Sequence, residues 1–175
     1  MVRILAVLLL SGLPLLAQQG TQPKVRMLLT LTPGFLTAQR TTTYGLGGEL
    51  ELYTQGKISL RGDAYALLGK STQGGLRQNY QGFLGIVYNF DRIGGLAPFA
   101  GFQPGFGFGQ VDTPATDVLR LYPALSPVFG AHYFADTFFH FTIHVRYVFG
   151  EMYYQQTGAV YLSELRAGFG LGIFF

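Results

Sequence analysis

The sequence lacks cysteine and tryptophan, and only 12% of its 175 residues are charged. Without cysteine the chain cannot form a disulfide framework, a cysteine-ligated zinc or iron–sulfur site, or a lipid-modified cysteine anchor. Soluble proteins carry charge on about a quarter of their residues, so this chain has too few charges to cover a water-exposed surface. The net charge of +3 is small and spread along the chain, and does not indicate nucleic-acid binding.

The residues that are abundant are those of an aromatic, glycine-rich β protein. The chain contains 25 Gly, 16 Phe and 11 Tyr, and 49% of its residues are hydrophobic. A mean hydropathy of +0.28 argues against intrinsic disorder. The length is that of one domain.

The N-terminus has the pattern of a secretory signal peptide. Arg3 precedes the apolar run 4–10, and polar residues follow Ala17. The alternative, a retained membrane helix, would need about 20 apolar residues. We predict a signal peptide at residues 1–17, with cleavage after Gly20 as a second option, and a mature domain at residues 18–175.

The mature chain alternates apolar and polar residues with a period of two, which indicates β-strands. In the segment 139–149, for example, Phe139, Phe141 and Ile143 share one face, while Arg146 lies on the other. The same alternation predicts eight strands, at about 24–35, 44–53, 58–68, 79–90, 96–108, 119–134, 139–149 and 161–175.

The two faces of these strands differ in charge. All charges assigned to strand interiors lie on the polar face: Arg26, Glu49, Glu51, Arg61, Asp63, Arg120, Arg146, Glu164 and Arg166. The aromatic stripe is too bulky to fill an eight-stranded interior, so we expect it to face lipid around a narrow polar lumen. A sheet in hydrocarbon must also close on itself. The sequence therefore predicts an all-β fold, an eight-stranded antiparallel up-and-down transmembrane β-barrel.

The predicted connections alternate in length. Those at 54–56, 91–95 and 135–137 are short, whereas those at 37–43, 69–78, 109–118 and 150–158 are longer. Outer-membrane barrels have short periplasmic turns and longer external loops. We therefore expect an integral bacterial outer-membrane protein with both termini in the periplasm.

The last strand resembles the C-terminal assembly signal of a known family. Its alternate apolar residues and terminal aromatic residue are Phe169, Leu171, Ile173 and Phe175. In this respect the chain is similar to the small eight-stranded outer-membrane barrels, the OmpA transmembrane domain and OmpX-like group. The resemblance implies transient contact with the barrel-assembly machinery, and a setting in outer-membrane lipid and lipopolysaccharide.

The inward charges, five basic and four acidic, nearly cancel. Unpaired charges in a narrow interior are costly, so we predict an ion-pair network that plugs the lumen. Hairpin geometry places Glu51 opposite Arg61, or Glu49 if the turn shifts by one residue, and places Arg146 opposite Glu164.

The inward face also carries all three histidines: His132, His140 and His144. A turn centred on Asp136 would set His132 opposite His140, but two histidines make a weak metal motif. His140 and Thr142 match only poorly the His-x-Ser pair of lipid A deacylases, because their phase turns them away from lipid. We assign no catalytic residue, metal or cofactor.

Two prolines interrupt the predicted pattern. Pro104 and Pro127 fall inside strands and almost opposite each other. Because proline removes a ladder donor, we expect a shared bulge or break in that hairpin.

The sequence therefore predicts a non-enzymatic outer-membrane barrel with a structural or surface-interaction role through its external loops. One alternative is a lipid A-modifying enzyme. Another is an accessory subunit of an outer-membrane secretion or uptake complex. The chain does not identify a surface ligand or an envelope partner.

Overall fold

The computed structural model describes residues 24–53, 56–69, 76–111, 119–135, 139–154 and 158–174. The predicted signal peptide and Phe175 lie outside these ranges. Among the described residues, no helix is long and apolar enough to cross a membrane. The strands are β1 (Lys24–Leu36), β2 (Thr41–Tyr53), β3 (Ile58–Leu67), β4 (Leu76–Asn89), β5 (Leu96–Val111), β6 (Arg120–Phe134), β7 (Phe139–Tyr154), β8 (Gly158–Tyr161) and β9 (Glu164–Phe174).

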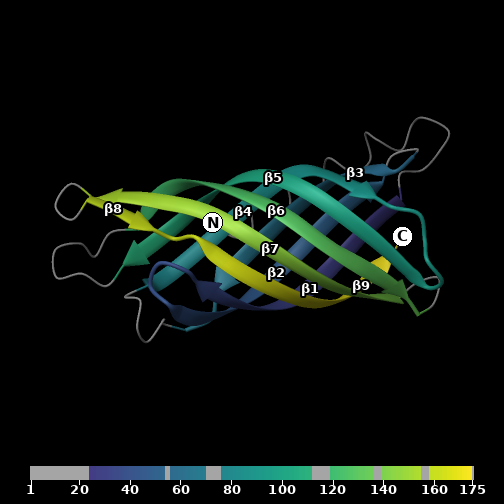
Figure 1. Ribbon diagram of the computed structural model, residues 1–175, viewed down its shortest axis with the longest axis horizontal. Coiled ribbons are helices and arrows are strands. Elements are labelled where there is room, and N and C mark those ends of the chain that lie inside the picture. Colours follow the sequence, from purple (N-terminus) through teal and green to yellow (C-terminus); the bar gives the residue numbers. More distant parts are fainter. Residues whose placement is uncertain are drawn as a thin grey trace, which may run out of the picture.

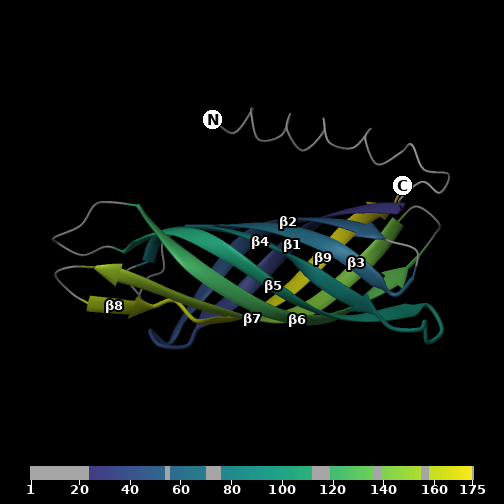
Figure 2. The same ribbon diagram turned by 90° about the horizontal axis from the view of Figure 1, so that it is seen from above.

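The strands form one closed antiparallel sheet (Figures 1 and 2). Each strand from β1 to β7 pairs with the next, and β9 pairs with both β7 and β1, which closes the barrel. Strands β8 and β9 occupy one position beside β7, separated by Leu162 and Ser163. The closed eight-stranded barrel predicted from the sequence is confirmed.

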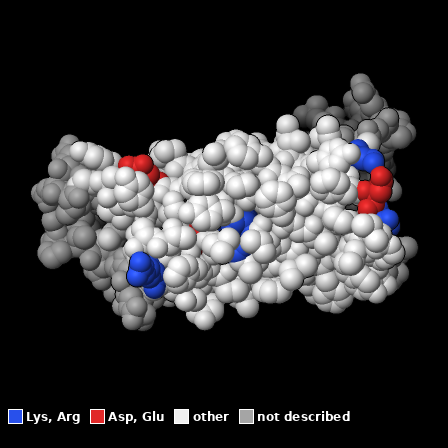
Figure 3. All heavy atoms as spheres, viewed as in Figure 1, with Lys and Arg blue, Asp and Glu red and all other residues white. Residues whose placement is uncertain are grey.

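The apolar stripe faces outward. Phe139, Phe141 and Ile143 are about half exposed, at 48%, 53% and 51%, whereas Arg146 and Glu164 are 4% and 1% exposed. Figure 3 shows a wall made mostly of uncharged residues, with charged groups toward its two ends and a small patch of Lys or Arg atoms near its middle. This is the inverse of a soluble barrel and matches the apolar band of a membrane barrel.

Exposed tyrosines lie near both ends of the barrel wall. Tyr88 and Tyr133 lie near the end at which β1 begins and β9 stops, which we call the terminal end. Tyr44, Tyr80, Tyr153 and Tyr161 lie toward the opposite end, which we call the loop end. Tyrosine is enriched at both membrane–water interfaces, so these positions suit two aromatic belts.

The strands extend farther toward the loop end than the sequence predicts. Strand β2 begins at Thr41, β5 continues to Val111 and β7 to Tyr154. The loop-end connections are thereby reduced to 37–40, 68–75, 112–119 and 155–157, compared with 54–57, 90–95 and 135–138 at the terminal end. The predicted consistent difference in length is therefore wrong for two of the four loops. The strands continue because inward apolar residues at this end pack against one another, as described below.

The two prolines do not break their shared hairpin. Pro104 pairs with Leu125, and Pro127 with Phe102, in an uninterrupted β5–β6 register, so the predicted shared bulge is wrong. Pairing is instead interrupted between β4 and β5 beside Pro104, and between β6 and β7 beside Pro127. A strand residue directs its N–H toward one neighbour only, so each proline removes a bond from one strand pair and spares the other.

Candidate functional site

The barrel interior is lined by buried charges of both signs. Four arginines and four carboxylates are each at most 9% exposed: Arg26, Arg61, Arg146, Arg166, Glu49, Glu51, Asp63 and Glu164. Arg120, the remaining charge assigned to this network, is half-buried at the start of β6 at the loop end. The formal charges of the eight fully buried groups cancel, which favours a paired arrangement in an interior shielded from water.

The layer at the terminal end is built around Glu51. This carboxylate accepts hydrogen bonds from Arg26 and from the Ser59 hydroxyl. Asn89 Nδ2 donates in turn to Ser59 Oγ at 2.9 Å. Glu51 lies opposite Arg61 in the β2–β3 register, as predicted, but its ion pair is with Arg26 on β1.

The central layer is built around Arg61 and Asp63. Arg61 donates through Nη2 to Glu49 Oε2 at 2.5 Å and through Nε to Asp63 Oδ1 at 2.9 Å. The second Asp63 oxygen accepts a hydrogen bond from Arg146, which reaches across the lumen from β7. Arg146 also donates to Gln103 Oε1 at 2.8 Å. One aspartate therefore joins two arginines from different sides of the barrel.

The layer toward the loop end is built around Arg166. Its Nη2 atom donates to Glu164 Oε2 and to Gln81 Oε1, both at 2.5 Å. The predicted pairing of Arg146 with Glu164 is wrong, because Arg146 lies opposite Arg166. Tyr154 pairs with Gly158 at the head of this hairpin. The β7–β9 hairpin is therefore centred one residue later than predicted. This change moves the partner of each β7 residue by two positions, so the same side chains still face inward.

Each buried guanidinium group also lies over an inward aromatic ring, a feature absent from the sequence prediction. The pairs are Arg26 with Tyr53, Arg61 with Phe99, Arg146 with Phe83, and Arg166 with Tyr65, at 5.5, 5.1, 5.1 and 3.5 Å from the ring centroid. Such contacts are favourable for cations removed from water. The sequence could have predicted these inward rings, because each of the four aromatic residues occupies a strand position that alternates with lipid-facing positions.

Glycine makes room for one of these rings. A Cβ atom at Gly45 would overlap the Tyr65 ring, which lies against β2. The glycine therefore allows Tyr65 to lie close to the barrel wall and beneath the Arg166 guanidinium group. This is a packing reason for glycine on an inward strand position.

The interior at the loop end is apolar. Side chains from several strand ends form a buried cluster that we call the apolar cap: Leu36, Leu76, Val111, Val148, Met152 and Leu162. Tyr122 joins this cluster to the polar layers, donating to Asn79 Oδ1 at 2.5 Å and accepting from Gln81 Nε2 at 2.6 Å. The sequence analysis missed the cap, although Val148 and Met152 continue the inward phase set by Arg146.

All three histidines lie inside the barrel and are at most 2% exposed. His132 lies opposite Thr142, not opposite His140 as predicted, and its Nδ1 atom is 2.6 Å from Thr142 Oγ1. The hairpin is centred one residue later than the prediction placed it, with Phe134 opposite His140. His132 stacks on Phe99 at 4.3 Å between ring centroids. Within the described ranges, no group of three or more His, Asp or Glu residues could hold a metal ion.

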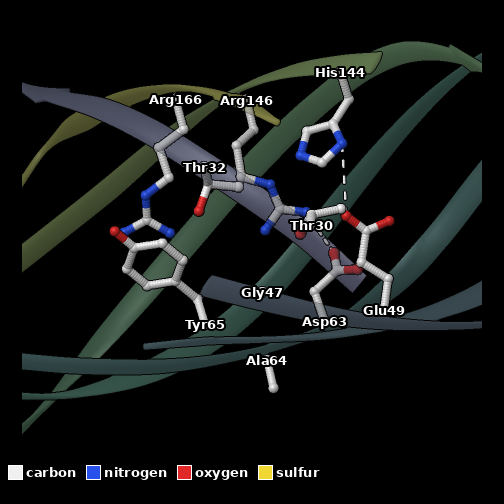
Figure 4. Close-up of a pocket in the computed structure, with 10 residues that line it drawn as sticks. All are labelled: Thr30, Thr32, Gly47, Glu49, Asp63, Ala64, Tyr65, His144, Arg146 and Arg166. Atoms are coloured by element: carbon white, nitrogen blue, oxygen red, sulfur yellow. Dashed lines mark hydrogen bonds and ion pairs between the residues drawn. The ribbon is translucent and has the colours of Figure 1, made fainter. Parts of the chain in front are cut away.

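Little space remains among these side chains. A cavity of about 10 Å³ lies in the central lumen, bordered by residues that include Glu49, Asp63, Tyr65, Arg146 and Arg166 (Figure 4). This is about the space that one water molecule needs.

The comparisons with known proteins rest on structure. No protein-family model matches the sequence, and no curated protein matches it. Neisserial surface protein A aligns with a TM-score of 0.67 at 12% identity, over 86% of this chain and 96% of that chain. The N-terminal β-barrel domain of Pseudomonas aeruginosa OprF aligns with a TM-score of 0.66 at 14% identity, over 87% and 97%. The chain has the fold of the small outer-membrane β-barrels.

A third solved structure is also similar to this chain. Ail, the attachment invasion locus protein of Yersinia pestis, aligns with a TM-score of 0.53 at 11% identity, over 87% of this chain and 97% of that chain. At these identities the likeness establishes the fold and supports a membrane barrel. A shared fold does not imply a shared function, so the role of this chain depends on its own side chains.

Proposed function

We propose that the protein is an integral outer-membrane barrel with a closed lumen, acting as a structural element of the envelope or through contacts made at its loop end. The observation that carries this proposal is that apolar side chains face outward and charged side chains face inward, the reverse of a soluble barrel. An apolar wall surrounds buried charges that cancel one another. Both termini face the periplasm in this arrangement, and the loop end faces outward. Phospholipid and lipopolysaccharide surround the wall, and the barrel-assembly machinery inserts it.

The packing of the interior supports a closed lumen. An ion crossing the barrel would have to separate Asp63 from Arg61 and Arg146, and then pass the apolar cap. Breaking a buried ion pair leaves an uncompensated charge and costs several kcal/mol. The cavity beside these groups, at about 10 Å³, is much smaller than a hydrated ion.

The histidine chemistry supports a non-enzymatic role. An enzyme acting on outer-leaflet lipid needs a nucleophile and a base that face the lipid or the loop end. His132, His140 and Thr142 instead lie inside the barrel, toward the terminal end. No described residue set favours the lipid-modifying enzyme over the closed barrel.

Two measurements on the purified, refolded protein test this proposal. Gel migration of a folded barrel is expected to change on boiling, and planar bilayers containing the protein are expected to show no steady conductance. A steady large current through the unmodified protein would contradict the closed lumen. Identical migration before and after boiling would contradict the membrane barrel.

A further inference from the structure

Two buried arginines lie directly opposite each other in the central lumen. Arg146 on β7 and Arg166 on β9 are cross-strand partners, and they are 4% and 1% exposed. Side chains directly opposite on antiparallel strands have Cβ atoms about 4.5–5.5 Å apart, and like charges in such a pair repel. Figure 4 shows both side chains entering the space between the walls from the same side. A like-charge pair in a buried interior requires a compensating group.

The neighbouring carboxylates are shared unevenly among the central arginines. Asp63 binds Arg146 but also binds Arg61. Glu49 binds Arg61, and Glu164 binds Arg166. The formal charges of these three arginines and three carboxylates cancel, but Arg146 shares its only carboxylate partner with Arg61.

The hydrogen-bonding groups of this pair are not all used. Within the described part of the chain, Arg146 Nε and Arg166 Nε and Nη1 are buried without a hydrogen-bond partner. Both side chains line the cavity of about 10 Å³, and the Tyr65 hydroxyl lies beside the Arg166 guanidinium group (Figure 4). A guanidinium group offers N–H donors only. The unpartnered arginine atoms at this cavity are therefore all donors.

We propose that this cavity binds a small monatomic anion of the chloride type between Arg146 and Arg166. A water molecule has only two lone pairs, whereas a halide ion can accept from several donors at once. The negative charge also offsets the repulsion between the two arginines, and buried donors left without a partner are costly. The site rests on the closed lumen proposed above, because an open lumen would solvate both arginines.

Chloride-dependent stability tests the site in the refolded protein. Unfolding is measured in sodium chloride and in sodium gluconate at equal ionic strength, because gluconate is too large for the cavity. Binding to the folded state raises the ratio of folded to unfolded protein by a factor of 1 + [L]/Kd. Chloride at ten times its dissociation constant should therefore raise this ratio about elevenfold, and the effect should saturate.

A pair of matched tyrosine variants locates the effect. Tyr65→Phe keeps the ring beneath Arg166 and removes a hydroxyl at the cavity, so the chloride effect should weaken at least threefold in apparent affinity. Tyr122→Phe removes a buried hydroxyl in the adjacent layer, where it bonds to Asn79 and Gln81, and should leave the chloride effect unchanged. Equal stability of the unmodified protein in both salts would overturn the proposal. So would an equal chloride effect in both variants.

Crystals grown in bromide give a second test that needs no variant. An anomalous peak between Arg146 and Arg166 is expected, and an ordered water at that position without bromide would overturn the proposal. The conductance measurement separates this inference from the proposed function. A non-conducting barrel without chloride dependence refutes only the anion site, whereas a conducting barrel refutes the closed lumen itself.

Discussion

Replacing Asp63 with asparagine is expected to lower the free energy of unfolding by about 3–5 kcal/mol, the usual cost of removing one partner from a buried ion pair. Asparagine keeps the size of the side chain but leaves Arg61 and Arg146 without the carboxylate that they share. Both arginines are at least nine-tenths buried, so water cannot readily replace it. Urea unfolding of the protein refolded into lipid vesicles measures the change.

The exposed ion pair at the terminal end provides the matched control. Lys57 Nζ lies 2.6 Å from Asp91 Oδ2, and the two side chains are 47% and 84% exposed. The hydrogen bond to Asp91 raises the pKa of the Lys57 ammonium group, yet solvent screens the pair. Asp91→Asn should therefore leave the free energy of unfolding nearly unchanged. If Asp63→Asn changed it equally little, the lumen would have to be hydrated.

Replacing Ile143 with arginine is expected to destabilise the barrel in a bilayer by about 2–4 kcal/mol, the cost of an arginine on the lipid face at the membrane midplane. Ile143 lies near the middle of the outward row of β7 and is 51% exposed in the isolated barrel. The expected loss comes from burying a charge in hydrocarbon. Urea unfolding in vesicles again measures it.

A position beyond the membrane-facing wall controls for the same substitution. Ile93 is 73% exposed and lies in the connection between β4 and β5. Ile93→Arg should cost about 0–1 kcal/mol, the value found near a membrane interface. An inexpensive Ile143→Arg variant would indicate that water rather than lipid surrounds the wall.

The sequence predicted the barrel because the determining signal is local. Phe139, Phe141 and Ile143 alternate with charged and histidine residues, and this phase alone decides which face is outward. Every inward charge assigned from phase lies at the interior or its rim in the structure. Closure of the sheet then follows from the need to satisfy strand edges in a membrane.

The partners of the inward charges could not be predicted in the same way. Arg146 reaches Asp63 across the lumen, and no hairpin rule relates residues on β7 to residues on β3. The register of a hairpin also depends on one residue in its turn, and an error of that size moved Glu164 away from Arg146. Long arginine side chains further weaken the link between register and pairing, since Arg61 binds Glu49 although Glu51 lies opposite it.

The aromatic rings inside the lumen were missed for a different reason. The argument that bulky residues do not fit an eight-stranded interior holds for a whole stripe but not for single rings. Phe83 and Phe99 each lie beneath an arginine guanidinium group, at 5.1 Å from the ring centroid. Glycines on neighbouring strands leave the necessary room, as Gly45 does for Tyr65.

The apolar cap makes the two halves of the barrel thermodynamically different. Lipid-facing side chains are stabilised by the acyl chains of the bilayer, which they enter only on folding because an unpaired backbone cannot remain in hydrocarbon. Leu36, Val111 and Met152 instead leave water when the strand ends come together. The stability of the loop-end half should therefore depend on apolar packing within the protein, while that of the terminal half should respond chiefly to the strength of its ion pairs.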